Sequence, residues 1–195
     1  MRRLGAWRAM ALAATLVATA APALAFDLAE LAASRQRVME GTARFHETRH
    51  VSALAAPVER EGTLLYRRPD YLEMNVESPR TERMVINGRT LRLTTPSGER
   101  TLALDSEPML LAWTESLRAT LAGDVPALER FFATSLSGDS GAWKLTLEPR
   151  EAILRAQIAS IVISGAGDAI RRIEMREQGG DDAVMDIAPQ RMRLP

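Results

Sequence analysis

The chain has 195 residues, with 25 basic and 25 acidic side chains, a formal charge of zero and no cysteine. Balanced charge argues against a protein that binds nucleic acid by neutralising phosphates. The lack of cysteine excludes disulfides, Cys-ligated metal sites, cysteine nucleophiles and lipid-modified cysteines. The length fits one domain, and an apolar content of 46% is typical of a folded chain.

The first 25 residues have the pattern of a secretory signal peptide. Three arginines form a basic start, an apolar run follows over residues 9–21, and small residues stand at Ala23 and Ala25. We predict cleavage after Ala25 rather than an uncleaved anchor, because the apolar run is short for a membrane span. Residues 26–195 then form the exported domain, which keeps 22 basic and 25 acidic residues and a formal charge of about −3.

An amphipathic helix is predicted at the start of the exported domain, over residues 26–41. Asp27 can cap its free amides, and Glu30 stands three residues later, where it can close a capping box. Apolar residues then recur at helical spacing, and Gly41 is expected to end the helix. A helix of this kind must lie on an apolar surface.

From Thr42 onward the pattern predicts short strands joined by turns. Apolar and polar residues alternate, and Asn87-Gly88 is the strongest short hairpin signal. The strands recur about every ten residues, as in a meander. The predicted strands are 43–51, 58–68, 71–76, the stretches around 84–86, 91–93 and 102–104, and then 143–147, 158–164, 169–176 and 183–187.

Two helices interrupt these strands. The first begins at Asp105 and ends at Gly123, and the second is capped by Asp124 and extends to Phe132. Residues 137–141 are predicted as a loop. An antiparallel sheet of about ten strands must curl or split, so the three helices are expected to lie across its concave face. Periodicity does not decide whether the space between helices and sheet is a filled core or a cavity.

One motif resembles a zinc site. His46-Glu47-Thr48-Arg49-His50 matches H-E-x-x-H, which in zinc peptidases places two ligands and a base on one helix face. Here the residue types favour a strand, on which the two histidines stand about 13 Å apart, too far to share one ion. No further histidine exists, so Glu73 would have to be the third ligand.

A second motif resembles a nucleophile segment. Gly138-Asp139-Ser140-Gly141 is similar to the serine segment of trypsin-like peptidases, but the domain is short for that double barrel and neither histidine has the expected context. We interpret these residues as a turn. No motif specifies catalysis, a cofactor or a metal, so the residues favour a binding protein.

Two motifs carry a family resemblance. The core Gly-x-Leu-x-x-x-Arg-Pro at residues 62–69 is followed by a hairpin of the form (I/V)-x-(D/N)-G-(K/R)-x-L at residues 85–91. This resembles the LolA family of periplasmic outer-membrane lipoprotein carriers, especially its shorter LolA-related branch. The resemblance implies a mostly antiparallel, unclosed half β-barrel with a lid of helices, and a cavity that accepts acyl chains.

The resemblance also assigns residues. Arg68 matches the family arginine beside the proline, which reaches into the cavity and hydrogen-bonds the lid until cargo arrives; the alternative is a surface arginine that snorkels beside Pro69. Glu47 stands where the family usually has Gln, and Leu72 where the better-known branch often has an aromatic residue. Candidates for the cavity lining, each equally an ordinary core residue, are Leu72, Met74, Leu110, Trp113 and Leu117.

We therefore expect a non-enzymatic, monomeric periplasmic carrier without a cofactor. It would bind acyl chains of lipoproteins or a related lipid, and contact an inner-membrane exporter and an outer-membrane acceptor transiently. Phe26 stands at the predicted mature N-terminus, where membrane-anchored acceptors of this fold need a lipid-modified cysteine, and the tail after Ile187 is short. Two alternatives are a zinc peptidase on His46, Glu47 and His50, and a half-barrel sensor or scaffold that binds a protein.

Overall fold

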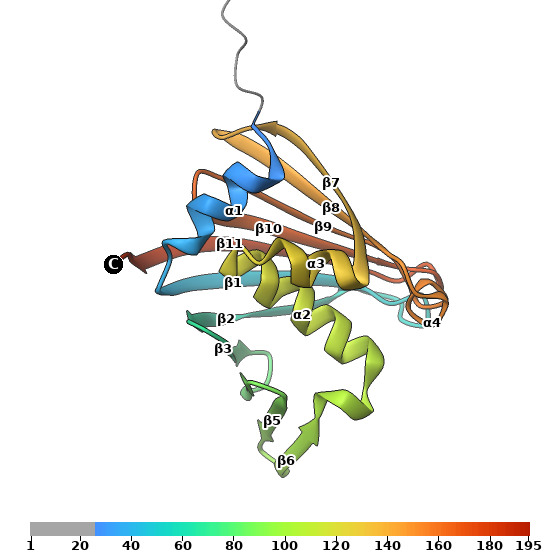
Figure 1. The fold of residues 1–195 in the computed structure, drawn as a ribbon. Coiled ribbons are helices and arrows are strands. Elements are labelled where there is room, and N and C mark those ends of the chain that lie inside the picture. The colour runs from blue at the N-terminus through green and yellow to red at the C-terminus, as the bar shows by residue number, and fades with distance from the viewer. Residues whose placement is uncertain (1–25) are drawn as a thin grey trace, which may run out of the picture.

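A computed structural model describes residues 26–195, in which helices lie against one antiparallel sheet of eleven strands (Figure 1). The predicted signal peptide, residues 1–25, lies outside the described residues. The strands are β1 Glu40–His50, β2 Val58–Arg67, β3 Tyr71–Ser78, β4 Glu82–Asn87, β5 Thr90–Thr95, β6 Gly98–Ala103, β7 Phe132–Asp139, β8 Ala142–Pro149, β9 Ile158–Ala166, β10 Ala169–Glu177 and β11 Asp182–Arg193. The helices are α1 Leu28–Gln36, the 3-10 helix η1 Leu104–Ser106, α2 Pro108–Ala122, α3 Val125–Phe131 and α4 Ala152–Arg155.

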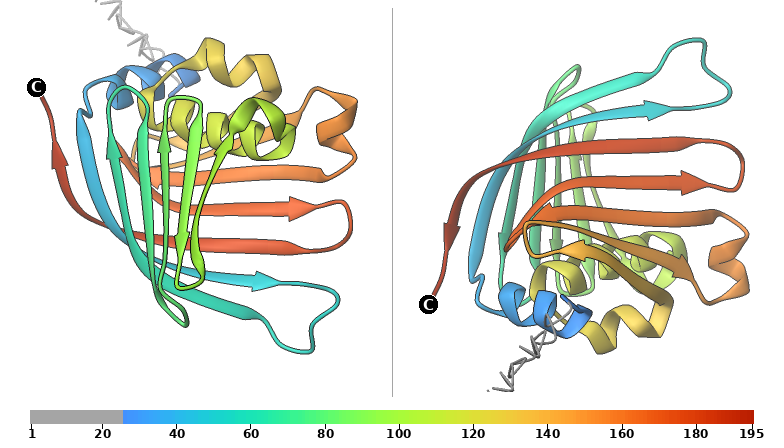
Figure 2. Two further views of the ribbon diagram at one scale, coloured as in Figure 1. Left: turned by 90° about the horizontal axis from the view of Figure 1, so that it is seen from below. Right: turned by 90° about the horizontal axis from the view of Figure 1, so that it is seen from above.

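The strands follow the order β6-β5-β4-β3-β2-β1-β11-β10-β9-β8-β7. Every neighbouring pair is consecutive along the chain except β1 and β11, which join the first strand to the last. β6 and β7 are consecutive in sequence but stand at opposite edges, with α2 and α3 between them. The sheet therefore curls without closing, as the views in Figure 2 show, and the predicted unclosed antiparallel fold is confirmed.

Capping residues position the helices as predicted. Asp27 accepts a hydrogen bond from the Glu30 amide at 2.8 Å, and Asp124 accepts one from the Ala127 amide at 3.1 Å. Gly123 ends α2 in the left-handed region, at φ 68°. Figure 2 shows α1, α2 and α3 on the concave side of the sheet, whereas α4, which the sequence did not predict, connects β8 to β9.

The predicted first helix is too long. It ends at Gln36, and Gly41, the expected helix end, lies inside β1 opposite Tyr66 of β2 and Met192 of β11. The backbone of Met39 already bonds to the sheet, donating to the Arg193 carbonyl at 2.9 Å and accepting from the Arg68 amide at 2.9 Å. Pairing on both sides of β1 thus satisfies the backbone better than another helical turn.

Two predictions, the end of the second helix at Phe132 and the loop over residues 137–141, are wrong because an eleventh strand lies there. Phe132 begins β7, which pairs with β8 along its whole length. Only residues 140–141 turn, and the Asp139 carboxylate accepts from the Gly141 amide at 2.8 Å. In the segment that resembles a serine nucleophile, Gly138 and Asp139 therefore end β7, and Ser140 and Gly141 form the predicted turn.

The predicted last strand is too short. β11 continues from residue 187 to Arg193, so the tail that was expected to follow the sheet is part of it. Pro189 lies where the register between β1 and β11 shifts, next to Ala43. Proline lacks an amide donor, so an irregular position is where a strand tolerates it.

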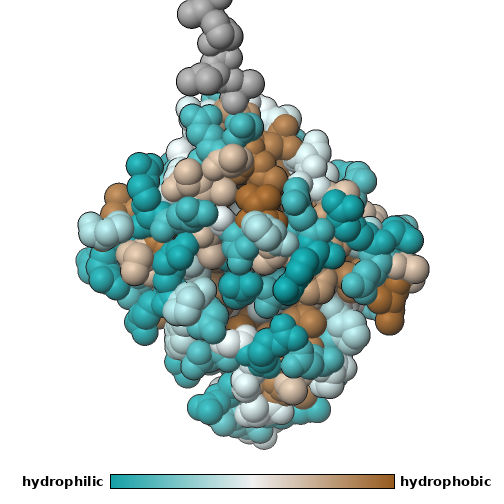
Figure 3. Space-filling model, viewed as in Figure 1, coloured by the Kyte–Doolittle hydropathy of each residue, from teal (hydrophilic) through white to brown (hydrophobic). Residues whose placement is uncertain are grey.

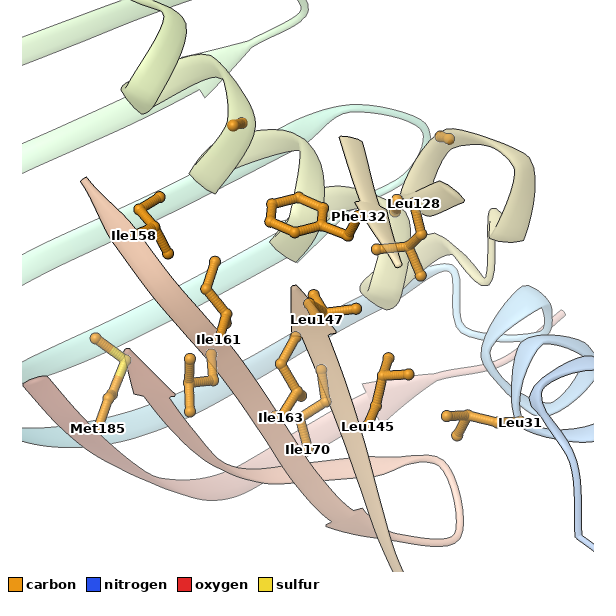
Figure 4. Packing of buried hydrophobic residues seen from close by; sticks show 14 of the residues in the cluster. Leu31, Leu128, Phe132, Leu145, Leu147, Ile158, Ile161, Ile163, Ile170 and Met185 are labelled. Carbon is orange, nitrogen blue, oxygen red and sulfur yellow. The ribbon is translucent and has the colours of Figure 1, made fainter. Parts of the chain in front are cut away.

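The buried apolar side chains form two clusters. The larger one, shown in Figure 4, includes Phe132, Leu145, Leu147, Ile161 and Ile163. The smaller one includes Val38, Tyr66, Leu72, Ile86, Leu91 and Leu104. Leu117 and Leu121 of α2 pack against both, so α2 joins the two halves of the core.

The helix-bearing face is mainly hydrophilic on the outside. Figure 3, seen from the same side as Figure 1, shows hydrophilic residues predominating, with hydrophobic areas between them. Within residues 26–195, no helix is long and apolar enough to cross a membrane.

Candidate functional site

A cavity lies between α2 and the concave face of the sheet. Its empty space, which includes the open mouth, has a volume of about 1110 Å³. Within this space, the centre of a water molecule could occupy about 130 Å³. α2 contributes Trp113, Leu117 and Leu121. The strands contribute five methionines, Met74, Met84, Met175, Met185 and Met192. Since methionine is flexible and polarizable, such a wall can adapt to an apolar guest of variable shape.

Most of the predicted lining is in this cavity. Four of the five apolar candidates line it, namely Leu72, Met74, Trp113 and Leu117. Leu110 packs instead against the smaller core cluster. The space between helices and sheet, which periodicity left open, thus contains both a core and a cavity.

Arg68 reaches from the end of β2 to the end of α2. Its Nε donates to the Val38 carbonyl at 3.1 Å and its Nη2 to the Ala122 carbonyl at 2.5 Å. The side chain is partly buried, so it does not simply extend into solvent beside Pro69. The contact to Ala122 is a hydrogen bond to a helix that covers the cavity.

Three side chains bind consecutive carbonyls at the C-terminal end of α2, and we call them the helix clamp. Arg35 Nη2 donates to Leu121 at 3.3 Å, Arg68 Nη2 to Ala122, and Gln36 Nε2 to Gly123 at 3.1 Å. The last carbonyls of a helix lack internal partners and carry its negative partial charge. Two guanidinium groups therefore stabilise the position of α2 over the cavity.

Arg35 was missed by the sequence analysis. It is only 2% exposed, and its Nη1 also donates to the Asp168 carbonyl in the turn between β9 and β10. Burial lowers the pKa of Arg35, while the nearby charge of Asp168 acts in the opposite direction. The available signal was helical spacing, because Arg35 follows Leu28, Leu31 and Ala32 on one face of α1.

A second charged group in the cavity wall, the carboxylate of Glu47, is neutralised by an arginine of the neighbouring strand. Glu47 is 6% exposed and lines the cavity. It stands directly opposite Arg60 on β2, and Arg60 Nε donates to its carboxylate at 2.7 Å. This pair replaces the Gln that the family resemblance led us to expect, and it was also missed from the sequence.

The H-E-x-x-H residues do not form one site. They lie on β1, where Glu47 is buried while His46 and His50 are exposed. His46 pairs with Glu59 at 3.0 Å and His50 with Asp182 at 3.2 Å. Among residues 26–195, no group of three or more His, Cys, Asp or Glu side chains could hold a metal ion.

Glu73, considered as a third zinc ligand, belongs to a different network. It accepts hydrogen bonds from Arg83 Nε at 3.0 Å, from Asn75 Nδ2 at 2.9 Å and from the Tyr71 hydroxyl. These donors, chiefly Arg83, lower the pKa of Glu73 to about 2. Its role is to bind β3 to β4.

Comparison with known proteins identifies the family. Residues 20–188 match the family model described as outer membrane lipoprotein carrier protein LolA-like. The chain belongs to this LolA-like family. The resemblance seen in the motifs at residues 62–69 and 85–91 is thereby confirmed. No curated protein matches the sequence.

Several solved structures are similar to this LolA-like chain. A LolA superfamily protein from Nitrosomonas europaea is 12% identical, with 86% of this chain and 92% of that chain covered and a TM-score of 0.47. MucB in the MucA/MucB complex of Pseudomonas aeruginosa is 13% identical, with 85% and 56% covered and a TM-score of 0.48. A putative outer membrane lipoprotein-sorting protein domain from Vibrio parahaemolyticus is 11% identical, with 86% and 90% covered and a TM-score of 0.44.

Proposed function

We propose that this LolA-like protein is a periplasmic carrier that binds acyl chains of a lipoprotein, or of a related lipid, in the cavity beneath α2. The apolar, methionine-rich wall is the observation that supports this function most directly. Each methylene group removed from water contributes about 0.8 kcal/mol, so even a partly buried chain has useful affinity. Membership of the family supports the same conclusion.

In this proposal α2 is the lid of the cavity and the helix clamp keeps it shut. An arginine in apolar surroundings is costly unless its donors are paired, so Arg68 favours the state in which it reaches Ala122. An entering acyl chain displaces α2 and breaks that contact. The lid then closes again when the chain leaves, because the carbonyls of α2 regain their partners.

The transfer needs no chemistry and no cofactor. Cargo arrives from an inner-membrane exporter and leaves to an outer-membrane acceptor, with the carrier acting as a monomer between them. The predicted signal peptide supplies the route of export. The apolar wall contacts only the acyl chain, whatever group the acyl chain is attached to outside the cavity. A lipoprotein and a smaller acylated lipid therefore both fit this role.

The test is lipid binding. Native mass spectrometry of the purified protein should show bound lipid, and the delipidated protein should take up a fluorescent acyl probe. Leu117→Trp, which fills the cavity, should weaken probe binding at least about tenfold. Ile153→Trp is the matched control, because Ile153 on α4 is 55% exposed and outside the cavity.

Two results would contradict the proposal. One is a protein without bound lipid that also takes up no acyl probe. The other is equal probe affinity in Leu117→Trp and Ile153→Trp, since binding would then occur elsewhere. A stable protein partner together with an empty cavity would favour a sensor or scaffold instead.

A further inference from the structure

Two buried polar atoms at the clamp end of the cavity have no hydrogen-bond partner among residues 26–195. They are Arg35 Nε and the Tyr66 hydroxyl oxygen, and both residues line the cavity. Both atoms are enclosed; Arg35 lies on α1 and donates to Leu121 at the end of α2, and Tyr66 lies on β2. A buried polar atom without a partner destabilises a protein, so such a pair in one cavity calls for an explanation.

Two arginines lie near these atoms, and of the two Arg35 lines the cavity. In the part of the chain that the structure describes, the guanidinium groups of Arg35 and Arg68 form hydrogen bonds to backbone carbonyls and none to a carboxylate, although the charge of Asp168 acts on Arg35. They lie close enough to Tyr66 for both to act against the rise that burial causes in its pKa. Glu47, in contrast, is already neutralised by Arg60.

We propose that the clamp end of the cavity binds the anionic head of the cargo, a carboxylate or a phosphate, through Arg35 Nε–H and the Tyr66 hydroxyl. The inference rests on the proposed carrier function and specifies its substrate class as an anionic amphiphile. Both atoms are donors, and an anion supplies the acceptors they lack. The acyl tail then follows the apolar row of Leu121, Leu117 and Trp113 along α2.

The first test compares heads on one tail. Dodecanoate, dodecyl phosphate and 1-dodecanol share a twelve-carbon chain and differ in charge. Each is used below its micelle concentration to displace a bound fluorescent acyl probe. We expect at least one of the two anions to bind about tenfold or more tightly than the alcohol, as for a hydrogen bond to a charged group. The tighter anion distinguishes a carboxylate from a phosphate head.

The second test uses Tyr66→Phe. Because the hydroxyl has no partner among residues 26–195, its removal should leave the unfolding temperature unchanged or raise it. The preference for the anion over the alcohol should nevertheless fall several-fold. Arg44→Gln is the control, since Arg44 is an exposed cation paired with Glu77, and its preference should equal that of the unsubstituted protein.

The outcomes separate the inference from the function beneath it. Equal affinity for the two anions and the alcohol would show that the cavity binds the acyl tail and does not distinguish the head groups. That result would overturn the inference and leave the proposed carrier function intact. Unchanged anion preference in Tyr66→Phe would also overturn the inference. If no probe binds, the head site and the carrier function both fail.

Discussion

Replacing Arg68 by Leu should loosen the lid while leaving the fold intact. The change removes two hydrogen bonds from a charged donor, those to Val38 at 3.1 Å and Ala122 at 2.5 Å. Each is worth about 1.5–3 kcal/mol, and the apolar surface of Leu offsets part of the loss. Only the Ala122 bond joins Arg68 to α2, so a net shift of about 1–3 kcal/mol against the closed lid changes the ratio of closed to open forms by roughly 5-fold to 150-fold.

Stopped-flow uptake of a fluorescent acyl probe measures this shift. If opening of α2 precedes binding, the uptake rate should rise with the open population, and release should slow because the closed empty form is less favoured. Arg67→Leu is the matched control. Arg67 is adjacent but 51% exposed on its side chain, and it bonds to Glu40 at 2.9 Å, away from α2. Uptake and release that agree within twofold between the two variants, with native circular dichroism in both, would refute the gating role.

Three further predictions concern stability, measured by urea unfolding. Gly62→Ala should cost about 3 kcal/mol or more, since its Cβ would lie 1.8 Å from the Asn75 carbonyl oxygen; a cost under ~0.5 kcal/mol would contradict so close an approach of β3 to Gly62. Glu73→Gln should cost about 1–2 kcal/mol at pH 7, because the pKa of Glu73 is lowered to about 2 chiefly by half-exposed Arg83. That stabilisation is complete above pH ~4.5 and is lost as the pH falls towards 2, so the two proteins should converge there; a constant difference would argue against it. Asp124→Ala should cost ~1 kcal/mol through the lost cap of α3, and no change would show that the cap is redundant.

The parts of the fold that local chemistry determines were predictable. Asp27 and Asp124 cap helices, Gly123 ends α2, and Pro96-Ser97 makes a two-residue turn between β5 and β6. Each of these depends on the conformational preference of one residue or on a hydrogen bond to a near neighbour. The signals therefore survive without knowledge of the rest of the sheet.

The errors arose where a distant strand decides the structure. Phe132 could continue a helix or begin a strand, and pairing with β8 selects the strand. Residues 188–193 have no strong pattern of their own, yet β1 holds them in β11. Gly41 is suited to end a helix, but its backbone lies in β1, which pairs with a strand on each side. Such contacts cannot be read from a local window of sequence.

The apolar side of the candidate site was predictable from the residue pattern, whereas on its polar side only Arg68 was predicted, and that from the family resemblance. Leucine, methionine and tryptophan at regular spacing indicated which residues face inward. Arg35 is a charged residue on an apolar helix face, which was visible in the sequence. Its partner, the C-terminal end of α2, was not, so its role could not be predicted. Glu47 drew attention as part of a metal motif, whereas strand alternation places it beside Phe45 on the buried face, with Arg60 as its partner.

The polar groups around α2 act against each other in the empty protein. The helix clamp holds the end of α2 through hydrogen bonds from charged donors, each worth about 1.5–3 kcal/mol. Arg35 Nε and the Tyr66 hydroxyl are buried in the same structure without partners among residues 26–195, at a cost of about 1–3 kcal/mol each. The two contributions are opposite in sign and similar in size. If the protein is the carrier we propose, such opposition suits it, because a deeply stable lid would not admit cargo and an unstable one would expose the apolar wall to water.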